Sequence, residues 1–89
     1  MISHTTERFR KAFVDLPKQV QLQAKDAYKQ FKKDPFYPGL RFKRVHSTKP
    51  IYSVRINFEY RAVGIQDENE MIWFWIGSHD EYTKLLSRL

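Results

Sequence analysis

Cationic side chains are concentrated in one stretch of this sequence, from Leu40 to Arg61. The stretch holds six of them and a single carboxylate, Glu59; the six are Arg41, Lys43, Arg44, Lys49, Arg55 and Arg61. Aromatic residues lie in the same stretch, among them Tyr52, Phe58 and Tyr60. Guanidinium and ammonium groups bind phosphate oxygens, and bases stack on aromatic rings, so the combination suits single-stranded RNA. An ordinary solvated strand face has the same composition.

Arg61 opens a segment in which the next residues of the same parity, Val63 and Ile65, are apolar. A charge at the head of an apolar strand face needs a partner. It either binds a phosphate through two of its N–H groups or forms a structural ion pair with Glu59 or Glu70. The sequence leaves both interpretations open.

His79 lies where an apolar segment gives way to a predicted helix, a common place for functional side chains. An imidazole takes up and releases protons near neutral pH, so His79 is a candidate general acid or base. The alternative is an ordinary helix-start residue beside Asp80 and Glu81. His4 and His46 are distant in sequence and the chain has no cysteine, so we expect no metal site, no thiolate nucleophile and no cofactor.

The composition limits the kind of fold that can position these residues. With 89 residues the chain has room for one hydrophobic core, so we expect a single domain over residues 1–89. A hydrophobic fraction of 42% argues against disorder, and a net charge of +6 favours polyanionic or acidic partners. The longest apolar run, Met71–Ile76, is far too short to span a membrane, and the first residues lack a signal segment. We therefore expect a cytoplasmic protein.

Apolar spacing predicts two helices at the start of the chain. Residues at i, i+3, i+4 and i+7 give the first helix an apolar face from about Thr6 to Asp15: Phe9, Ala12, Phe13 and Leu16. Thr5 or Thr6 can cap this helix, and Pro17 is well placed at the first position of the second. The second helix repeats the spacing up to about Lys33 through Val20, Ala24, Ala27 and Phe31. We expect an antiparallel helical hairpin.

Alternating residues predict strands in the rest of the chain. Four segments are strand-like: Leu40–Val45, Ile51–Ile56, Tyr60–Ile65 and Met71–Ile76. The last is apolar at every position and should be buried on both faces, with Trp73 and Trp75 in the core. Ser78 precedes Glu81 by three residues, a capping-box spacing that starts a short C-terminal helix. The expected fold class is α+β, an N-terminal helical hairpin packed on an antiparallel sheet of about four strands.

Three segments, taken in order, resemble the RelE/ParE toxin superfamily: YSVRI at 52–56, YRAVG at 60–64 and IGSHDEY at 76–82. With the two-helix start that contains Leu16-Pro17, the resemblance covers nearly the whole chain. It implies a shape like a compact microbial ribonuclease, with helices on one face of the sheet and a basic concave face left open. Two departures are visible: Ser53 stands where RelE itself has a lysine, and the usual first strand is hardly visible in Met1–Thr5.

The resemblance implies a toxin of a type II toxin–antitoxin pair, held inactive by a cognate antitoxin. In the RelE branch the toxin is an endonuclease that cuts mRNA on the ribosome without a metal, and we expect this function. The alternatives are a ParE-like inhibitor of DNA gyrase, which is not an enzyme, and an inactive relative that only binds an antitoxin.

Residue roles follow from the nuclease resemblance. Arg61 and Arg55 would stabilise the phosphate, His79 would act as acid or base, and Tyr82 would stack on a base or donate a proton. Binding of the RNA backbone would fall to three other basic residues: Arg41, Lys43 and Arg44.

Overall fold

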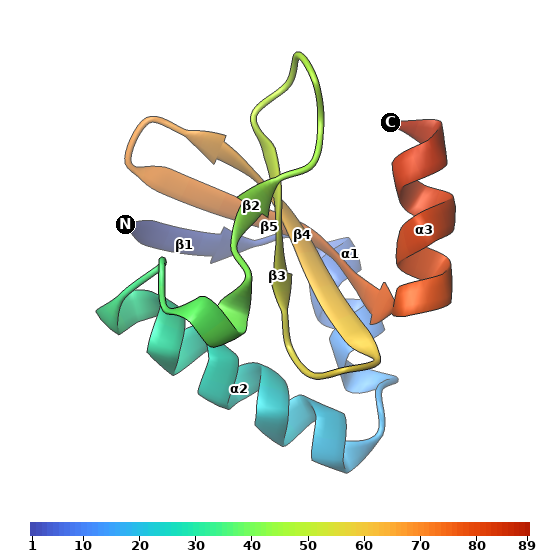
Figure 1. The fold of residues 1–89 in the computed structure, drawn as a ribbon. Coiled ribbons are helices and arrows are strands. Elements are labelled where there is room, and N and C mark those ends of the chain that lie inside the picture. The colour runs from blue at the N-terminus through green and yellow to red at the C-terminus, as the bar shows by residue number, and fades with distance from the viewer.

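Five strands form one sheet, with α-helices on both of its faces (Figure 1). The computed structural model describes residues 1–89. Along the chain the elements are β1 (Ile2–Thr5), α1 (Glu7–Val14), α2 (Lys18–Lys33), the 3-10 helix η1 (Pro38–Leu40), β2 (Lys43–Arg44), β3 (Ile51–Arg55), β4 (Tyr60–Asp67), β5 (Glu70–Ser78) and α3 (His79–Arg88). The strand order across the sheet is β1-β5-β4-β3-β2. Every neighbouring pair is antiparallel except β1 and β5, which are parallel. None of the helices combines the length and the apolar character needed to cross a membrane.

The helical hairpin of α1 and α2 covers one face of the sheet. It packs on a buried cluster formed by Phe31, Leu40, Val54, Ala62, Met71, Trp73 and Ile76. The rings of Phe31 and Trp73 meet edge to face with centroids 5.4 Å apart, a favourable geometry for two aromatic rings. Thr6 caps α1 by accepting a hydrogen bond from the Phe9 backbone N–H at 3.1 Å. The two predicted helices are confirmed, each within one residue of its expected ends.

α3 packs on the opposite face of the sheet. Val63 follows Ala62 in β4, so their side chains point to opposite faces. Val63 belongs to a second buried cluster with Ile51 and Tyr82, which we call the α3 cluster. Ser78 caps α3 by accepting from the Glu81 backbone N–H at 3.3 Å, as the capping spacing predicts. The apolar residues therefore form two clusters, one on each side of the sheet, instead of the single core expected from the chain length.

A β-bulge in β5 explains why its central run is apolar at every position. Across the β4–β5 ladder, Trp75 pairs with Val63. The next β4 residue, Gly64, pairs with Trp73, so Phe74 is an extra residue. The bulge lets Trp73 face the helical hairpin while Trp75 packs against the α3 cluster. Gly64 makes room for this arrangement, because a Cβ there would lie 2.8 Å from the Trp73 ring.

The strand predicted over Leu40–Val45 is wrong in extent. Residues Pro38–Leu40 form η1, which ends at Arg41 with a φ of 48°, in the left-handed region. A strand cannot continue through that backbone conformation, so β2 contains only Lys43 and Arg44.

The sheet also has a fifth strand that the sequence pattern does not predict. β1 pairs with β5 from Ile2 opposite Glu70 to Thr5 opposite Trp73. Its residues are mostly exposed, so it carries no alternating apolar pattern. The expected antiparallel arrangement is correct for the other four strands and incomplete at this edge.

Candidate functional site

Arg55 and Arg61 lie opposite each other at the end of the β3–β4 ladder. Arg61 has the same parity as Val63 of the α3 cluster, and Arg55 is its cross-strand partner, so both side chains belong to the α3 face of the sheet. Two like charges directly opposite on antiparallel strands destabilise the pairing. The arrangement is therefore unfavourable for the fold unless a bound anion compensates it.

No carboxylate lies within ion-pairing distance of Arg61. The ion pairs of the structure are elsewhere, on α1 and between β1 and β5, so neither Glu59 nor Glu70 forms the pairing that the sequence leaves open. Burial, and then the charge of Arg55, lower the pKa of the Arg61 guanidinium, and Arg41 acts in the same direction. Arginine nevertheless stays protonated in proteins. We call Arg41, Arg55 and Arg61 the arginine cluster. Glu59 is the carboxylate whose charge opposes these effects on the pKa of Arg61, but it forms no ion pair, so the net positive charge of the cluster suits a phosphate.

The turn between β3 and β4 is held by side-chain hydrogen bonds. Nη1 of Arg61 donates to three main-chain carbonyls: Asn57 at 2.8 Å, Tyr60 at 3.0 Å and Phe58 at 3.3 Å. The Oδ1 of Asn57 accepts from the backbone N–H groups of Glu59 at 2.8 Å and Tyr60 at 2.9 Å. The Nδ2 of Asn57 donates to Oε1 of Gln23 on α2 at 2.6 Å. The turn is thus fixed from both sides, and the remaining N–H groups of Arg61 are left for a ligand.

His79 is placed beside this turn by the pairing of β4 with β5. Tyr60 pairs with Ser78, and the His79 backbone N–H donates to the Glu59 carbonyl at 2.6 Å. The His79 side chain is exposed. The last strand therefore brings the start of α3 to the end of the sheet that carries Arg61, which is the arrangement that a joint role of the two residues requires.

Tyr82 is on the face of α3 that packs against the sheet, away from the open surface. It is only 7% exposed, and its hydroxyl donates to Oγ of Ser53 at 3.1 Å. Its ring centroid lies 5.9 Å from that of His79. The stacking role predicted for Tyr82 is wrong, because a buried ring cannot receive a base. Ser53, which stands where RelE has a lysine, is its buried hydrogen-bond partner.

The three residues predicted to bind the RNA backbone do not lie together. Lys43 pairs with Ser53 at the sheet edge and shares the face of the arginine cluster. Arg41 is close enough to Arg61 to lower its pKa. Arg44 instead donates through Nε to two carbonyls of the β2–β3 connection, at 3.1 Å and 3.2 Å. Lys43 therefore extends the positive surface of the arginine cluster, to which Arg41 belongs. Arg44 instead stabilises the loop between β2 and β3.

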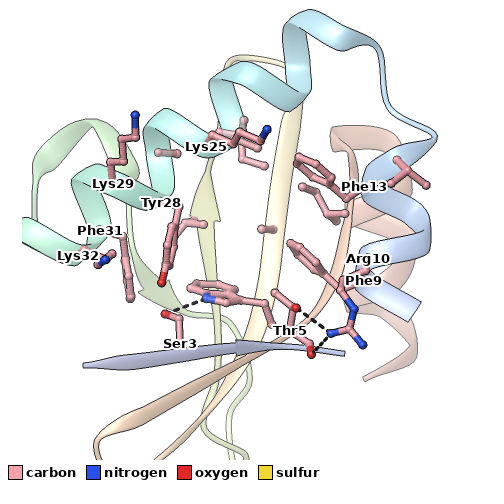
Figure 2. Close-up of a pocket in the computed structure, with 18 residues that line it drawn as sticks. Ser3, Thr5, Phe9, Arg10, Phe13, Lys25, Tyr28, Lys29, Phe31 and Lys32 are labelled. Carbon is pink, nitrogen blue, oxygen red and sulfur yellow. Dashed lines mark hydrogen bonds between the residues drawn. The ribbon is translucent and has the colours of Figure 1, made fainter. Parts of the chain in front are cut away.

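A groove of about 770 Å³ lies on the other face of the sheet, between α1, α2 and β1 (Figure 2). Two aromatic residues of each helix line it and face each other: Phe9 and Phe13 from α1, and Tyr28 and Phe31 from α2. Four cationic residues also line it: Arg10, Lys25, Lys29 and Lys32. No acidic residue does. The sequence pattern predicted these helix faces as core and carried no sign that they leave a groove between them.

The comparisons with known proteins agree with this fold. Residues 18–84 match the family described as ParE-like toxin domain. No curated protein sequence matches the chain. Three solved structures of similar fold illustrate the likeness. A chain of the RelB-RelE antitoxin-toxin complex from Methanococcus jannaschii has a TM-score of 0.73 at 12% identity, covering 91% of this chain and 95% of that chain. The YoeB dimer from Staphylococcus aureus has a TM-score of 0.68 at 18% identity, covering 89% and 97%.

The isolated E. coli RelE toxin has a TM-score of 0.67 at 16% identity, covering 98% of this chain and 96% of that chain. At these identities the structural likeness concerns the fold, whereas the family match spans most of the sequence and includes the whole β3–β4–β5 region. The chain belongs to the ParE-like toxin domain family, within the RelE/ParE toxin superfamily.

Proposed function

We propose that this chain is the toxin of a toxin–antitoxin pair and cleaves mRNA on the ribosome without a metal ion. The observation that carries the proposal is the arginine cluster, which has no acidic partner and lies at the same end of the sheet as the exposed His79. The cluster supplies positive charge for a phosphodiester, and the histidine supplies a group that moves protons near neutral pH.

In the proposed reaction the ribose 2′-OH attacks the adjacent phosphate and the bond to the next 5′-oxygen breaks. A 2′,3′-cyclic phosphate and a 5′-OH result. His79 takes the proton of the 2′-OH or gives one to the leaving oxygen. Arg55 and Arg61 stabilise the negative charge that grows on the phosphorane oxygens. Glu59, whose carbonyl binds the His79 backbone, is the candidate for the second proton transfer.

The test is cleavage of mRNA on programmed ribosomes by folded variants. Removal of a proton-transfer group costs about 10²- to 10⁴-fold in rate, so His79→Ala should slow cleavage by that factor. His4→Ala is the matched control, because His4 is also an exposed histidine but lies on β1. Cleavage by His79→Ala at the wild-type rate would contradict the proposal.

The second candidate function is inhibition of DNA gyrase without catalysis. Two observations favour it: the matching family is ParE-like, and the burial of Tyr82 leaves His79 as the one clear proton-transfer residue. Gyrase supercoiling and DNA breakage, measured with the same purified protein, separate the two functions. Inhibited gyrase together with intact mRNA would replace the nuclease assignment.

The partner that restrains the toxin is proposed to dock in the groove between α1, α2 and β1. Solved structures of similar fold include the RelB-RelE complexes, in which an antitoxin is bound to a toxin. The groove has an aromatic lining and several lysines on α2, with no carboxylate among its lining residues. An amphipathic segment of the antitoxin, with apolar residues on one side and acidic residues beside them, matches both properties.

Charge reversal on the groove tests this docking site. Lys25→Glu combined with Lys29→Glu should weaken binding of the antitoxin encoded beside the toxin by roughly tenfold or more, through lost and reversed rim charges. Lys84→Glu with Arg88→Glu on α3 changes the net charge equally and is the control. Cleavage of mRNA should stay the same in the Lys25→Glu/Lys29→Glu variant, because the arginine cluster is on the other face of the sheet from the groove. Equal weakening by both double variants would reduce the effect to net charge and contradict the site.

A further inference from the structure

Phe58 is an exposed aromatic residue in the turn between β3 and β4. It is 75% exposed and belongs to neither apolar cluster, so the fold gains little from its ring. The guanidinium carbon of Arg55 lies 5.6 Å from the centroid of that ring. An open ring face therefore lies beside a cation of the arginine cluster.

The backbone under Phe58 is fixed although its side chain is open to water. Arg61 donates to the carbonyl of Phe58 and to those of its neighbours in the turn. Asn57 closes the turn with its own side chain and ties it to α2 through Gln23. A ring on a fixed backbone has only two side-chain torsions left to order, so binding to it carries a small entropic cost.

We propose that Phe58 and Arg55 form a stacking subsite for an unpaired base of single-stranded RNA, next to the arginines that bind its phosphate. The inference rests on the proposed RNA-cleaving function and adds the place where a base of the substrate is held. A phenyl ring has no hydrogen-bond donor or acceptor, so the subsite accepts any base and requires only that the base is unpaired. It takes the stacking role that the buried Tyr82 cannot perform.

A protein partner fits this position less well than RNA does. Protein contacts concentrate on buried anchors surrounded by other residues that exclude water. Phe58 is flanked in the turn by Asn57 and Glu59, both polar, and the cation beside it is one of a like-charged group. A ring with neighbouring cations is the usual combination for single-stranded nucleic acid.

The experiment measures binding of the purified full chain, free of antitoxin, to two probes. One is a short 2′-O-methylated RNA oligonucleotide, which cannot be cleaved through its 2′-oxygen, and the other is the same backbone with abasic sugars. Phe58→Ala should weaken binding of the first probe about 5- to 150-fold, the range measured for loss of one stacked base. Phe58→Leu should weaken binding of the base-bearing probe as Phe58→Ala does, because leucine keeps an apolar side chain without an aromatic face. Phe58→Tyr should bind that probe like the wild type. Binding of the abasic probe should be equal in all of them.

Phe36→Ala is the matched control, because Phe36 is 76% exposed but lies in the connection after α2. A loss of affinity for the base-bearing probe in Phe36→Ala equal to that in Phe58→Ala would overturn the subsite. So would wild-type affinity in Phe58→Ala, or a loss confined to antitoxin binding, which would make Phe58 a protein contact. Cleavage of mRNA on programmed ribosomes is measured in parallel. If the wild type cleaves and Phe58→Ala binds normally, only the subsite fails; if the wild type neither cleaves nor binds RNA, the proposed function fails with it.

Discussion

Replacing the two opposed arginines should have different effects on the stability of the fold. Arg61→Ala removes three hydrogen bonds to turn carbonyls, two of them at 3.0 Å or shorter. A hydrogen bond from a charged donor contributes about 1.5–3 kcal/mol, and less where the acceptor can find water instead, as in this turn. We therefore expect the free energy of unfolding to fall by about 2 kcal/mol in total. Arg55→Gln removes a charge opposite Arg61 without breaking a comparable network, so stability should stay equal or rise by a few tenths of a kcal/mol.

Urea unfolding followed by the fluorescence of Trp73 and Trp75 measures both effects. In a chain of this size about 1 kcal/mol shifts Tm by roughly 4–8 °C, so Arg61→Ala should melt roughly 8–16 °C below the wild type. Inorganic phosphate should raise the Tm of the wild type by binding the arginine cluster and should raise that of Arg55→Gln less. If Arg55→Gln lowers the free energy of unfolding as much as Arg61→Ala does, the two charges do not repel each other and the reasoning fails.

Three further substitutions test single features. Arg41→Gly should leave the free energy of unfolding equal or raise it by about 1 kcal/mol, because glycine adopts the φ of 48° without strain, while a salt titration of RNA binding should show a slope smaller by about one. Gly64→Ala should lower the free energy of unfolding by roughly 1–3 kcal/mol in urea titrations, since its Cβ would meet the Trp73 ring. Tyr82→Phe should lower it by about 1 kcal/mol by breaking the bond to Ser53, yet cleave mRNA at the wild-type rate, and a large loss of cleavage would return a catalytic role to the hydroxyl.

The elements that sequence reasoning predicts correctly are those encoded by neighbouring residues. The apolar spacing from Phe9 to Leu16 is local, and so are the caps at Thr6 and Ser78. β3, β4 and β5 follow in the same way, because each buries a face large enough to leave a pattern in its own residues. The pattern even shows the unusual burial of Met71–Ile76, although only the structure gives its cause in a bulge at Phe74.

The elements that it misses depend on residues far away in the chain. β1 is stabilised by backbone pairing with β5, about seventy residues later, and its exposed side chains contribute no pattern. Arg41 alternates correctly with Leu40 and Phe42 for a strand, yet the turn of η1 places it in the left-handed region. The local alternation predicts a strand wrongly here, because Leu40 is buried in the cluster beneath the helical hairpin and not on a strand face.

The same distinction separates what the sequence says about the site from what it cannot say. The parity of Arg61 with Val63 identifies a charge at the head of an apolar face, but the identity of its partner depends on the register of β3 against β4 and on where nearby carboxylates point. The register places Arg55 opposite Arg61, and Glu59, two residues away, points its carbonyl to His79 instead of pairing its carboxylate with Arg61. An arginine pair without a carboxylate costs the fold about a few tenths of a kcal/mol through repulsion and returns no ion pair. Binding of an anionic ligand would offset that cost. The turn carbonyls that Arg61 binds explain why the residue is an arginine and not a lysine. The compact ammonium of a lysine cannot bind several carbonyls while keeping other donors free.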